Sequence, residues 1–232
     1  MTVAKAKPAG FFRRGLSHEQ DIVAFMQSIA RQQPGGRLVL DVGAREGKSS
    51  EPYAQIGWLV ASLDIAMGGL RRGASEGRIQ PGRAVVADGR NLPFRDGAFD
   101  LVSSRWFLHE FPDPVAFLRE MKRVVKDSGV VVAVDLAAPS RSSQAFLNRY
   151  IMPEEYVRTC GEFAEPWAEA GLAIETTEWH LWRMKRDDET RRAVCGQHSY
   201  VLQKVRDDLH IRCYDGHLFL RAPMAFVVAH KS

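Results

Sequence analysis

Short apolar runs separated by helical patterns extend along most of this chain. Five of the runs are typical of strands buried on both faces, and they lie at Leu38–Val42, Trp58–Leu63, Arg83–Ala87, Phe99–Ser104 and Val130–Val134. Between them, apolar residues recur at helical spacing, most clearly at Val115, Leu118, Met121 and Val124. Strands that alternate with helices predict a doubly wound, Rossmann-like α/β fold with a mostly parallel seven-stranded sheet and helices on both faces.

The first helices are marked by capping residues and glycines. Ser17 and Gln20 form a capping box ahead of an apolar stripe, and Pro34 with two glycines ends that helix. A short helix is expected from about Lys48. The glycine-rich stretch Gly68–Gly77 predicts an irregular loop.

The pattern loosens after Leu136. We expect an amphipathic segment at Gln144–Tyr150, a helix at Pro153–Ala170, a β-type run at Leu172–Trp182, a charged helix at Asp187–Asp208 and a last strand at Gly216–His230. Residues 139–152 and 183–215 are predicted to form a helical lid over the carboxyl ends of the parallel strands, where open α/β sheets bind ligands. No linker or repeat interrupts the chain, which predicts one domain over residues 1–232 with residues 1–14 as a disordered tail.

Composition favours a globular protein of the cytoplasm. The 232 residues are 45% hydrophobic and 26% charged, which is ordinary for a domain with a real core. No apolar run approaches the ~20 residues of a membrane span, and the N-terminus lacks the apolar core of a secretory signal. The three cysteines lie far apart, so neither a disulfide framework nor a metal site is indicated. The net charge of +4 comes from scattered arginines, which argues against a nucleic-acid partner.

The stretch Leu38–Ser50, LVLDVGAREGKSS, has the layout of a nucleotide-binding loop between a strand and a helix. Gly43 and Gly47 allow a sharp turn and a close approach of a ligand, because they carry no Cβ. Asp64 ends the next strand, 23 positions after Asp41. A carboxylate at about this spacing accepts hydrogen bonds from ribose hydroxyls in dinucleotide folds. The alternative for Asp64 is an ordinary turn residue.

This loop resembles the first motif of class I S-adenosylmethionine-dependent methyltransferases, a strand ending D-x-G-x-G-x-G, and not the nicotinamide motif G-x-G-x-x-G. Motifs of the type 11 branch, which includes ubiquinone and menaquinone C-methyltransferases, then follow in order: Ala87-Asp88-Gly89, Asn91-Leu92-Pro93-Phe94, Asp96, Phe99-Asp100-Leu101-Val102, Leu108-His109, Asp113-Pro114, Leu118-Arg119-Glu120-Met121 and Arg123-Val124-Val125-Lys126. The resemblance covers roughly Arg37 to Asp135. It implies S-adenosylmethionine as cofactor and methyl transfer to O, N or C of a small molecule.

The resemblance also implies a set of cofactor contacts. These are, in chain order, Asp41 and Gly43 beneath the methionine part, Asp64 at the ribose, Ile65, Asp88 and Gly89 at the adenine, and Ser104 and Arg105 beside the sulfonium. Arg45 departs from the pattern, because it stands where the family usually has the middle glycine. Its guanidinium either obstructs the methionine part or pairs with the methionine carboxylate. We expect the pairing, because Gly43 and Gly47 remain and a buried cation without a partner is costly.

A catalytic base is needed only for an acceptor that is not already nucleophilic, such as a phenol or a carbon acid. His109 and Glu110 follow the fourth strand at the ligand-binding edge and are the candidates. The alternative for His109 is a hydrogen bond to the backbone. The aromatic residues of the lid either line a pocket for a flat or hydrophobic acceptor or belong to the core: Phe146, Tyr150, Trp179 and Trp182.

Three classes of function stay open from the residues alone. The favoured one is a small-molecule methyltransferase, with a homodimer as an open alternative to a monomer. The second is a cyclase or decarboxylase on the same fold, which Arg45 would suggest. The third is a cofactor-free scaffold or an RNA methyltransferase.

Overall fold

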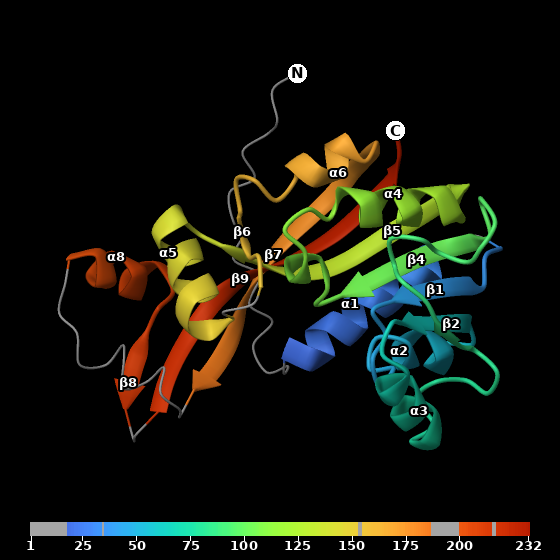
Figure 1. Ribbon diagram of the computed structural model, residues 1–232, viewed down its shortest axis with the longest axis horizontal. Helices are drawn as coiled ribbons and strands as arrows, with labels where there is room; N and C mark the ends of the chain where they lie inside the picture. Colours follow the sequence, from blue (N-terminus) through green and yellow to red (C-terminus); the bar gives the residue numbers. More distant parts are fainter. Residues whose placement is uncertain (1–17, 34, 153–154, 187–199, 215–216) are drawn as a thin grey trace.

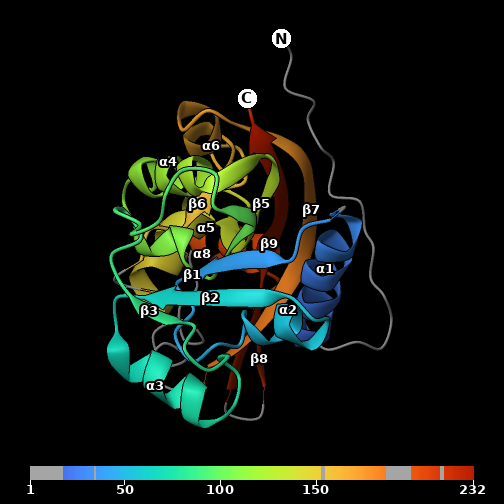
Figure 2. The ribbon, with the colours of Figure 1, turned by 90° about the vertical axis from the view of Figure 1, so that its right-hand side faces the viewer.

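The fold is built on one twisted sheet (Figures 1 and 2). The computed structural model describes residues 18–33, 35–152, 155–186, 200–214 and 217–232. Its strands are β1 (Leu38–Val42), β2 (Leu59–Asp64), β3 (Ala84–Val86), β4 (Phe99–Arg105), β5 (Val125–Ala138), β6 (Arg158–Thr159), β7 (Leu172–Arg186), β8 (Arg212–Tyr214) and β9 (His217–Lys231).

The sheet has nine strands in place of the predicted seven. Seven follow one path in the order β3-β2-β1-β4-β5-β9-β7, while β6 pairs with β5 and β8 pairs with β9. The strands from β3 to β5 are parallel, and β9 lies antiparallel between β5 and β7. The two additional strands are three residues long or shorter, and their apolar pattern is too brief to predict.

Helices cover both faces of the sheet, as predicted (Figure 2). They are α1 (His18–Gln32), α2 (Glu51–Gln55), α3 (Met67–Ser75), α4 (Val115–Val124), α5 (Arg141–Phe146), α6 (Glu165–Glu169) and α8 (Tyr200–Asp208), with a 3₁₀ turn η1 (Leu108–Glu110) and a π-helical turn η2 (Leu147–Ile151). Helices α1 and α2 pack on one face through Ile22, Met26 and Tyr53. Helices α4 and α6 pack on the other through a cluster that includes Leu118 and Trp167.

The stretch Gly68–Gly77 is largely helical, so the predicted irregular loop is wrong. Helix α3 packs against the loop after β1, and a Cβ at Gly69 or Gly73 would lie 3.0 Å or 2.5 Å from the backbone of Arg45 or Glu46. Glycine costs helix propensity, but here it lets a helix approach another backbone. Tertiary packing therefore outweighs the local preference.

The predicted helix at Pro153–Ala170 is also wrong in most of its length. Among the described residues of that range, Arg158–Thr159 pair with the end of β5, and only Glu165–Glu169 form a helix. The cysteine pattern needs a correction as well. Cys160 is free, but Cys213 is disulfide-bonded, a pairing that spacing along the chain did not indicate.

A separate hydrophobic cluster holds the lid together. It joins α5, η2 and α8 to the far ends of β5 and β9, and its largest buried members are Phe146, Leu147, Leu209 and Leu218. These elements extend from the sheet to the left in Figure 1. Of the predicted lid at 139–152, residues 141–151 are helical as α5 and η2, and their role as a lid stays a prediction. Of residues 183–215, positions 187–199 lie outside the described residues. Within the described part of the chain, no helix is long and apolar enough to cross a membrane.

Candidate functional site

Three residues stand side by side at the carboxyl edge of the parallel strands. Val42 at the end of β1 pairs with Leu63 of β2 and with Ser104 of β4. The residues one position further on, Gly43, Asp64 and Arg105, form a row along this edge. The order of the strands reverses between β1 and β4, and open α/β sheets bind ligands at such a point.

The loop after β1, residues 43–47, keeps a glycine-like shape although its middle position is arginine. Gly43, Arg45 and Gly47 have φ values of +78°, +46° and +78°. An arginine in the left-handed region is strained by about 1–2 kcal/mol, yet it adopts the conformation that glycine would. The departure at Arg45 therefore leaves the loop intact.

The space above Gly43 is filled by an aromatic ring of the same chain. A Cβ at this position would lie 2.5 Å from Cδ2 of Phe107. The ring of Phe107 also packs on Phe111 and Phe117, at centroid distances of 4.9 Å and 4.7 Å. The glycine was predicted to let a ligand approach, and in this structure it admits Phe107. Any ligand at this edge would meet that ring.

Asp64 is the acidic residue of the row. Its side chain is buried, and its two oxygens accept the backbone N–H of Arg45 at 2.9 Å and of Ala66 at 2.8 Å. Each oxygen keeps a further lone pair for a ligand hydroxyl. Just beyond it, the apolar side chain of Ile65 is 70% exposed and offers a surface on which a flat ring could pack. Met67 and Val86 are exposed beside it, and the sequence did not single them out.

Asp41 lies beneath the loop and not in contact with the edge. It is fully buried and accepts the Ser50 hydroxyl at 2.6 Å, while Ser50 and Ser62 are 2.7 Å apart. Burial raises the pKa of Asp41 to about 6, against the hydrogen bonds from the serines. Its oxygens are bound to Ser50 and Ser103, so its role beneath the methionine part stays a prediction.

Asp88 and Gly89 follow Ala87, whose backbone N–H donates to the carbonyl oxygen of Asp64 at 3.2 Å. The Asp88 carboxylate is held by Arg90, whose Nε and Nη2 donate at 2.7–3.1 Å, and these hydrogen bonds lower the pKa of Asp88. Gly89 is buried, and a Cβ there would lie 2.6 Å from Phe117 and 3.2 Å from Val42. The glycine is thus required for core packing.

The end of β4 carries the other two predicted residues. Ser104 is buried, and its Oγ has no hydrogen-bond partner among the described residues, so a donor or acceptor is available to a ligand there. Arg105 forms a bidentate pair with Glu19 of α1, with N···O distances of 2.7 Å and 2.5 Å. The sequence pattern alone gave no reason to join Glu19 to this edge.

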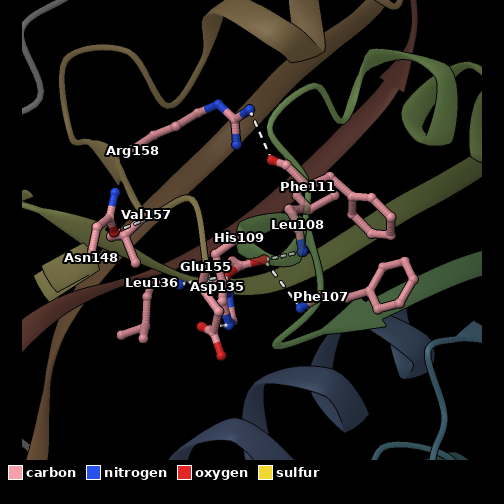
Figure 3. Close-up of polar contacts among 10 residues, drawn as sticks. All are labelled: Phe107, Leu108, His109, Phe111, Asp135, Leu136, Asn148, Glu155, Val157 and Arg158. Atoms are coloured by element: carbon pink, nitrogen blue, oxygen red, sulfur yellow. Dashed lines mark hydrogen bonds and ion pairs between the residues drawn. The ribbon is translucent and has the colours of Figure 1, made fainter. Parts of the chain in front are cut away.

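His109 is held between two carboxylates (Figure 3). Its Nδ1 faces Asp135 Oδ1, and its Nε2 lies 2.8 Å from Glu155 Oε2. We call Asp135, His109 and Glu155 the brace. Burial alone would lower the pKa of His109, but the charges and hydrogen bonds of both carboxylates raise it to about 10. Both ring nitrogens thus face carboxylates, an arrangement that favours the protonated imidazole.

The brace connects three parts of the chain. Asp135 at β5 also accepts the N–H groups of Phe107 and Leu108, at 3.3 Å and 2.6 Å. Arg158, beside the lid, donates to the carbonyl oxygens of Phe111 and Pro112, at 3.3 Å and 2.7 Å. The segment after β4 is fixed from both sides. The acidic end of β5 was visible in the sequence, whereas Glu155 and Arg158 carried no signal.

Glu110 is the remaining catalytic candidate. Burial raises the pKa of Glu110. The positive charges of His109 and Arg45 lower it, and the negative charge of Asp64 raises it further. A half-buried carboxyl group that keeps its proton more readily than usual is suited to proton transfer near neutral pH. Glu110 therefore stays the candidate for proton transfer, while His109 is held in the brace by its two carboxylates.

The aromatic residues predicted to share one acceptor pocket are divided between two clusters. Phe146 and Tyr150 pack together in the lid, with ring centroids 5.4 Å apart. Trp179 packs instead on Phe163 in the main core, at 5.6 Å. The side chain of Trp182 lies outside the described residues. Trp106, which the sequence did not single out, follows β4 with a φ of +56° and packs against two of the hydrophobic clusters, one of them in the predicted lid.

Comparison with known proteins assigns these features to a family. The profile described as "Methyltransferase domain" matches residues 40–133. A demethylmenaquinone methyltransferase from Renibacterium salmoninarum is 40% identical over 106 residues, which are 45% of this chain and 44% of that protein. The chain thus matches less than half the length of this relative. A demethylmenaquinone methyltransferase from Mycobacterium sp. (strain KMS) is 34% identical over 170 residues, 66% of this chain and 71% of that protein.

A solved structure extends the comparison over nearly the whole fold. The YcgJ protein from Bacillus subtilis superimposes with a TM-score of 0.74 at 19% sequence identity, covering 91% of this chain and 98% of that one. At this identity the likeness concerns the fold alone.

Proposed function

Because this chain belongs to the class I S-adenosylmethionine-dependent methyltransferases of the type 11 branch, we propose that it methylates a ring carbon of a small quinol. The observation that carries the choice of acceptor is the match to a demethylmenaquinone methyltransferase over 71% of that protein. The cofactor follows from the family. The acceptor is a proposal by analogy, because one fold supports many acceptors.

The residues at the carboxyl edge fit the cofactor. Asp64 offers its carboxylate to the ribose hydroxyls, and the exposed side chains of Ile65, Met67 and Val86 offer an apolar surface to the adenine. The buried Ser104 hydroxyl, which has no hydrogen-bond partner among the described residues, offers a polar group one position before the end of β4. When bound, S-adenosylmethionine supplies a methyl group on a positively charged sulfur. Asp88 would contribute less, since Arg90 already occupies its carboxylate.

The chain's own residues would activate and orient the acceptor. Glu110 would accept the proton of a quinol hydroxyl, which makes the ring carbon nucleophilic. The brace holds the segment that carries Glu110, so His109 is a positioning residue. The lid would exclude water from the aligned groups, and alignment supplies much of the rate enhancement in such a transfer.

Turnover with a defined acceptor tests this function. The protein is incubated with S-adenosylmethionine and a chemically reduced demethylmenaquinone with a short prenyl chain, and S-adenosylhomocysteine and the methylated ring are followed by mass spectrometry. We expect both products in equal amounts, and none with menaquinone, whose ring position is already methylated. Glu110→Gln should lower kcat by about 10²–10⁴-fold. Binding of S-adenosylhomocysteine without turnover of any quinol would contradict the proposed acceptor but not the cofactor.

Replacing Arg45 by glycine tests the residue on which the non-methylating alternative rested. Because Arg45 has a left-handed φ, Arg45→Gly should raise the free energy of unfolding by up to about 1 kcal/mol. The affinity for S-adenosylhomocysteine should change less than about threefold, because the backbone N–H that binds Asp64 is retained. Calorimetric titration and urea unfolding measure the two effects. A tenfold loss of affinity would restore the predicted clasp of the methionine carboxylate.

Self-association stays a prediction from the sequence. Sedimentation equilibrium at several protein concentrations would distinguish a monomer from a homodimer.

A further inference from the structure

Arg105 and Asp64 bracket Gly43 with opposite charges. Asp41, Ser62 and Ser103 share one face of the sheet, as their common hydrogen-bond network shows. Side chains alternate between faces along a strand, so Asp64 and Arg105, each two positions further on, belong to that same face. Two strand spacings, roughly 10 Å, separate their strands. A ligand with a diol at one end and a carboxylate at the other matches this order of groups.

Arg105 is a nearly buried guanidinium. Its side chain is only 9% exposed, and its Nε has no acceptor among the described residues. A buried cation must be paired, because leaving it alone costs several kcal/mol. In this structure, a carboxylate from elsewhere in the chain supplies the pairing.

That carboxylate comes from the first turn of α1. Glu19 binds Arg105 with both oxygens, although its own side chain is 53% exposed. Lys48, which follows the loop after β1, also acts on Glu19 through its charge. A half-exposed carboxylate thus pairs with Arg105, and the charge of Lys48 also favours its ionised form. It can leave Arg105 at little cost to itself, provided another carboxylate replaces it.

We propose that Glu19 occupies the subsite of the cofactor's methionine carboxylate, and that the cofactor binds by displacing Glu19 from Arg105. The proposal rests on the proposed function, since it requires S-adenosylmethionine as ligand. It assigns the carboxylate to Arg105 in place of Arg45, a loop residue whose backbone N–H binds Asp64. Glu19 then sets the affinity for the cofactor, and the first turn of α1 loses its contact with Arg105 when the cofactor binds, while Ile22 and Met26 keep α1 on the sheet.

The test compares two ligands that differ in the amino-acid part. S-adenosylhomocysteine carries the carboxylate, and 5′-methylthioadenosine lacks it. Glu19→Gln removes the internal competitor. The affinity for S-adenosylhomocysteine should rise about threefold to tenfold, because more of the protein is competent to bind. The affinity for methylthioadenosine should not change. Arg105→Gln should weaken S-adenosylhomocysteine by at least about tenfold, and the double variant should bind like Arg105→Gln alone.

Glu169→Gln is the matched control. It removes an exposed helix glutamate that pairs with Arg119 at 3.5 Å, far from this edge in α6, and should change neither affinity. Glu19→Asp, with its shorter reach, should shift S-adenosylhomocysteine binding in the same direction as Glu19→Gln.

Two results would overturn the proposal. One is unchanged or weaker S-adenosylhomocysteine binding in Glu19→Gln, which would make the pair a structural tie of α1. The other is equal tightening of both ligands, which would indicate a general opening of the edge. Failure of the wild type to bind either ligand would instead overturn the proposed function, and this inference with it.

Discussion

Replacing Asp135 by asparagine is expected to lower the free energy of unfolding by about 3–5 kcal/mol, the typical cost of breaking a buried ion pair. The Asp135 carboxylate receives the backbone N–H of Phe107, Leu108 and Leu136, and it faces the charged ring of His109. Asparagine keeps one acceptor oxygen and loses the charge. Urea unfolding at pH 7 measures the change.

The charge state of the brace also predicts a pH dependence. In the folded protein the pKa of His109 is about 10, above its ordinary value of ~6.5. The stability contributed by the charged imidazole is therefore complete below about pH 6.5 and is lost as the pH rises through about 10. His109→Gln lacks this contribution. The stability difference between wild type and His109→Gln should narrow from pH 6.5 to pH 10.

A difference that widens over this range would contradict a protonated His109. The control is His230→Gln, which removes a half-exposed imidazole that pairs with Glu175 at the surface, at 2.7 Å. The free energy of unfolding of that variant should fall by less than about 1 kcal/mol, because a surface ion pair contributes no more than this. Asp135→Asn should remove most of the pH dependence, because its carboxylate is one of the two that raise the pKa of His109.

The parallel strands and α4 could be predicted because their patterns are local. Each is a continuous apolar run or a stripe at helical spacing, and burial in the sheet requires nothing else. Helix α3 could not, because Gly69 and Gly73 disfavour a helix unless another backbone packs on them. That backbone, at Arg45 and Glu46, is brought there by the fold. The same limit explains why residues 155–164 were misread as helix.

The sequence predicts which residues line the edge of the sheet, but not which side chains pair with them. Asp64 and the loop after β1 follow from strand ends and glycines, which the sequence displays. The contacts of His109 with Glu155 and of Arg105 with Glu19 join residues 46 and 86 positions apart. No periodicity reports such pairs. A histidine after a strand therefore resembled a free base until its two carboxylates were known.

Asp64→Ala is expected to weaken S-adenosylhomocysteine binding by about 10- to 100-fold. Hydrogen bonds to a charged group contribute roughly 1.5–3 kcal/mol, and we propose the Asp64 carboxylate as the acceptor for both ribose hydroxyls. Alanine also frees the N–H groups of Arg45 and Ala66, which loosens the loop after β1. Calorimetric titration gives the affinity, and thermal unfolding shows whether the fold is retained.

Two further variants separate the ribose contact from the support of the loop. Asp64→Asn keeps an acceptor for a backbone N–H and loses the charge, so its affinity should fall between those of wild type and Asp64→Ala. Asp88→Asn is the control, because Arg90 already binds that carboxylate. This variant should lower the affinity for S-adenosylhomocysteine by less than about threefold. If Asp64→Asn binds as tightly as wild type while Asp64→Ala does not, Asp64 serves the loop alone. A carboxylate is needed for a diol, but any acceptor can hold an amide N–H, so this pair of variants decides between the two roles.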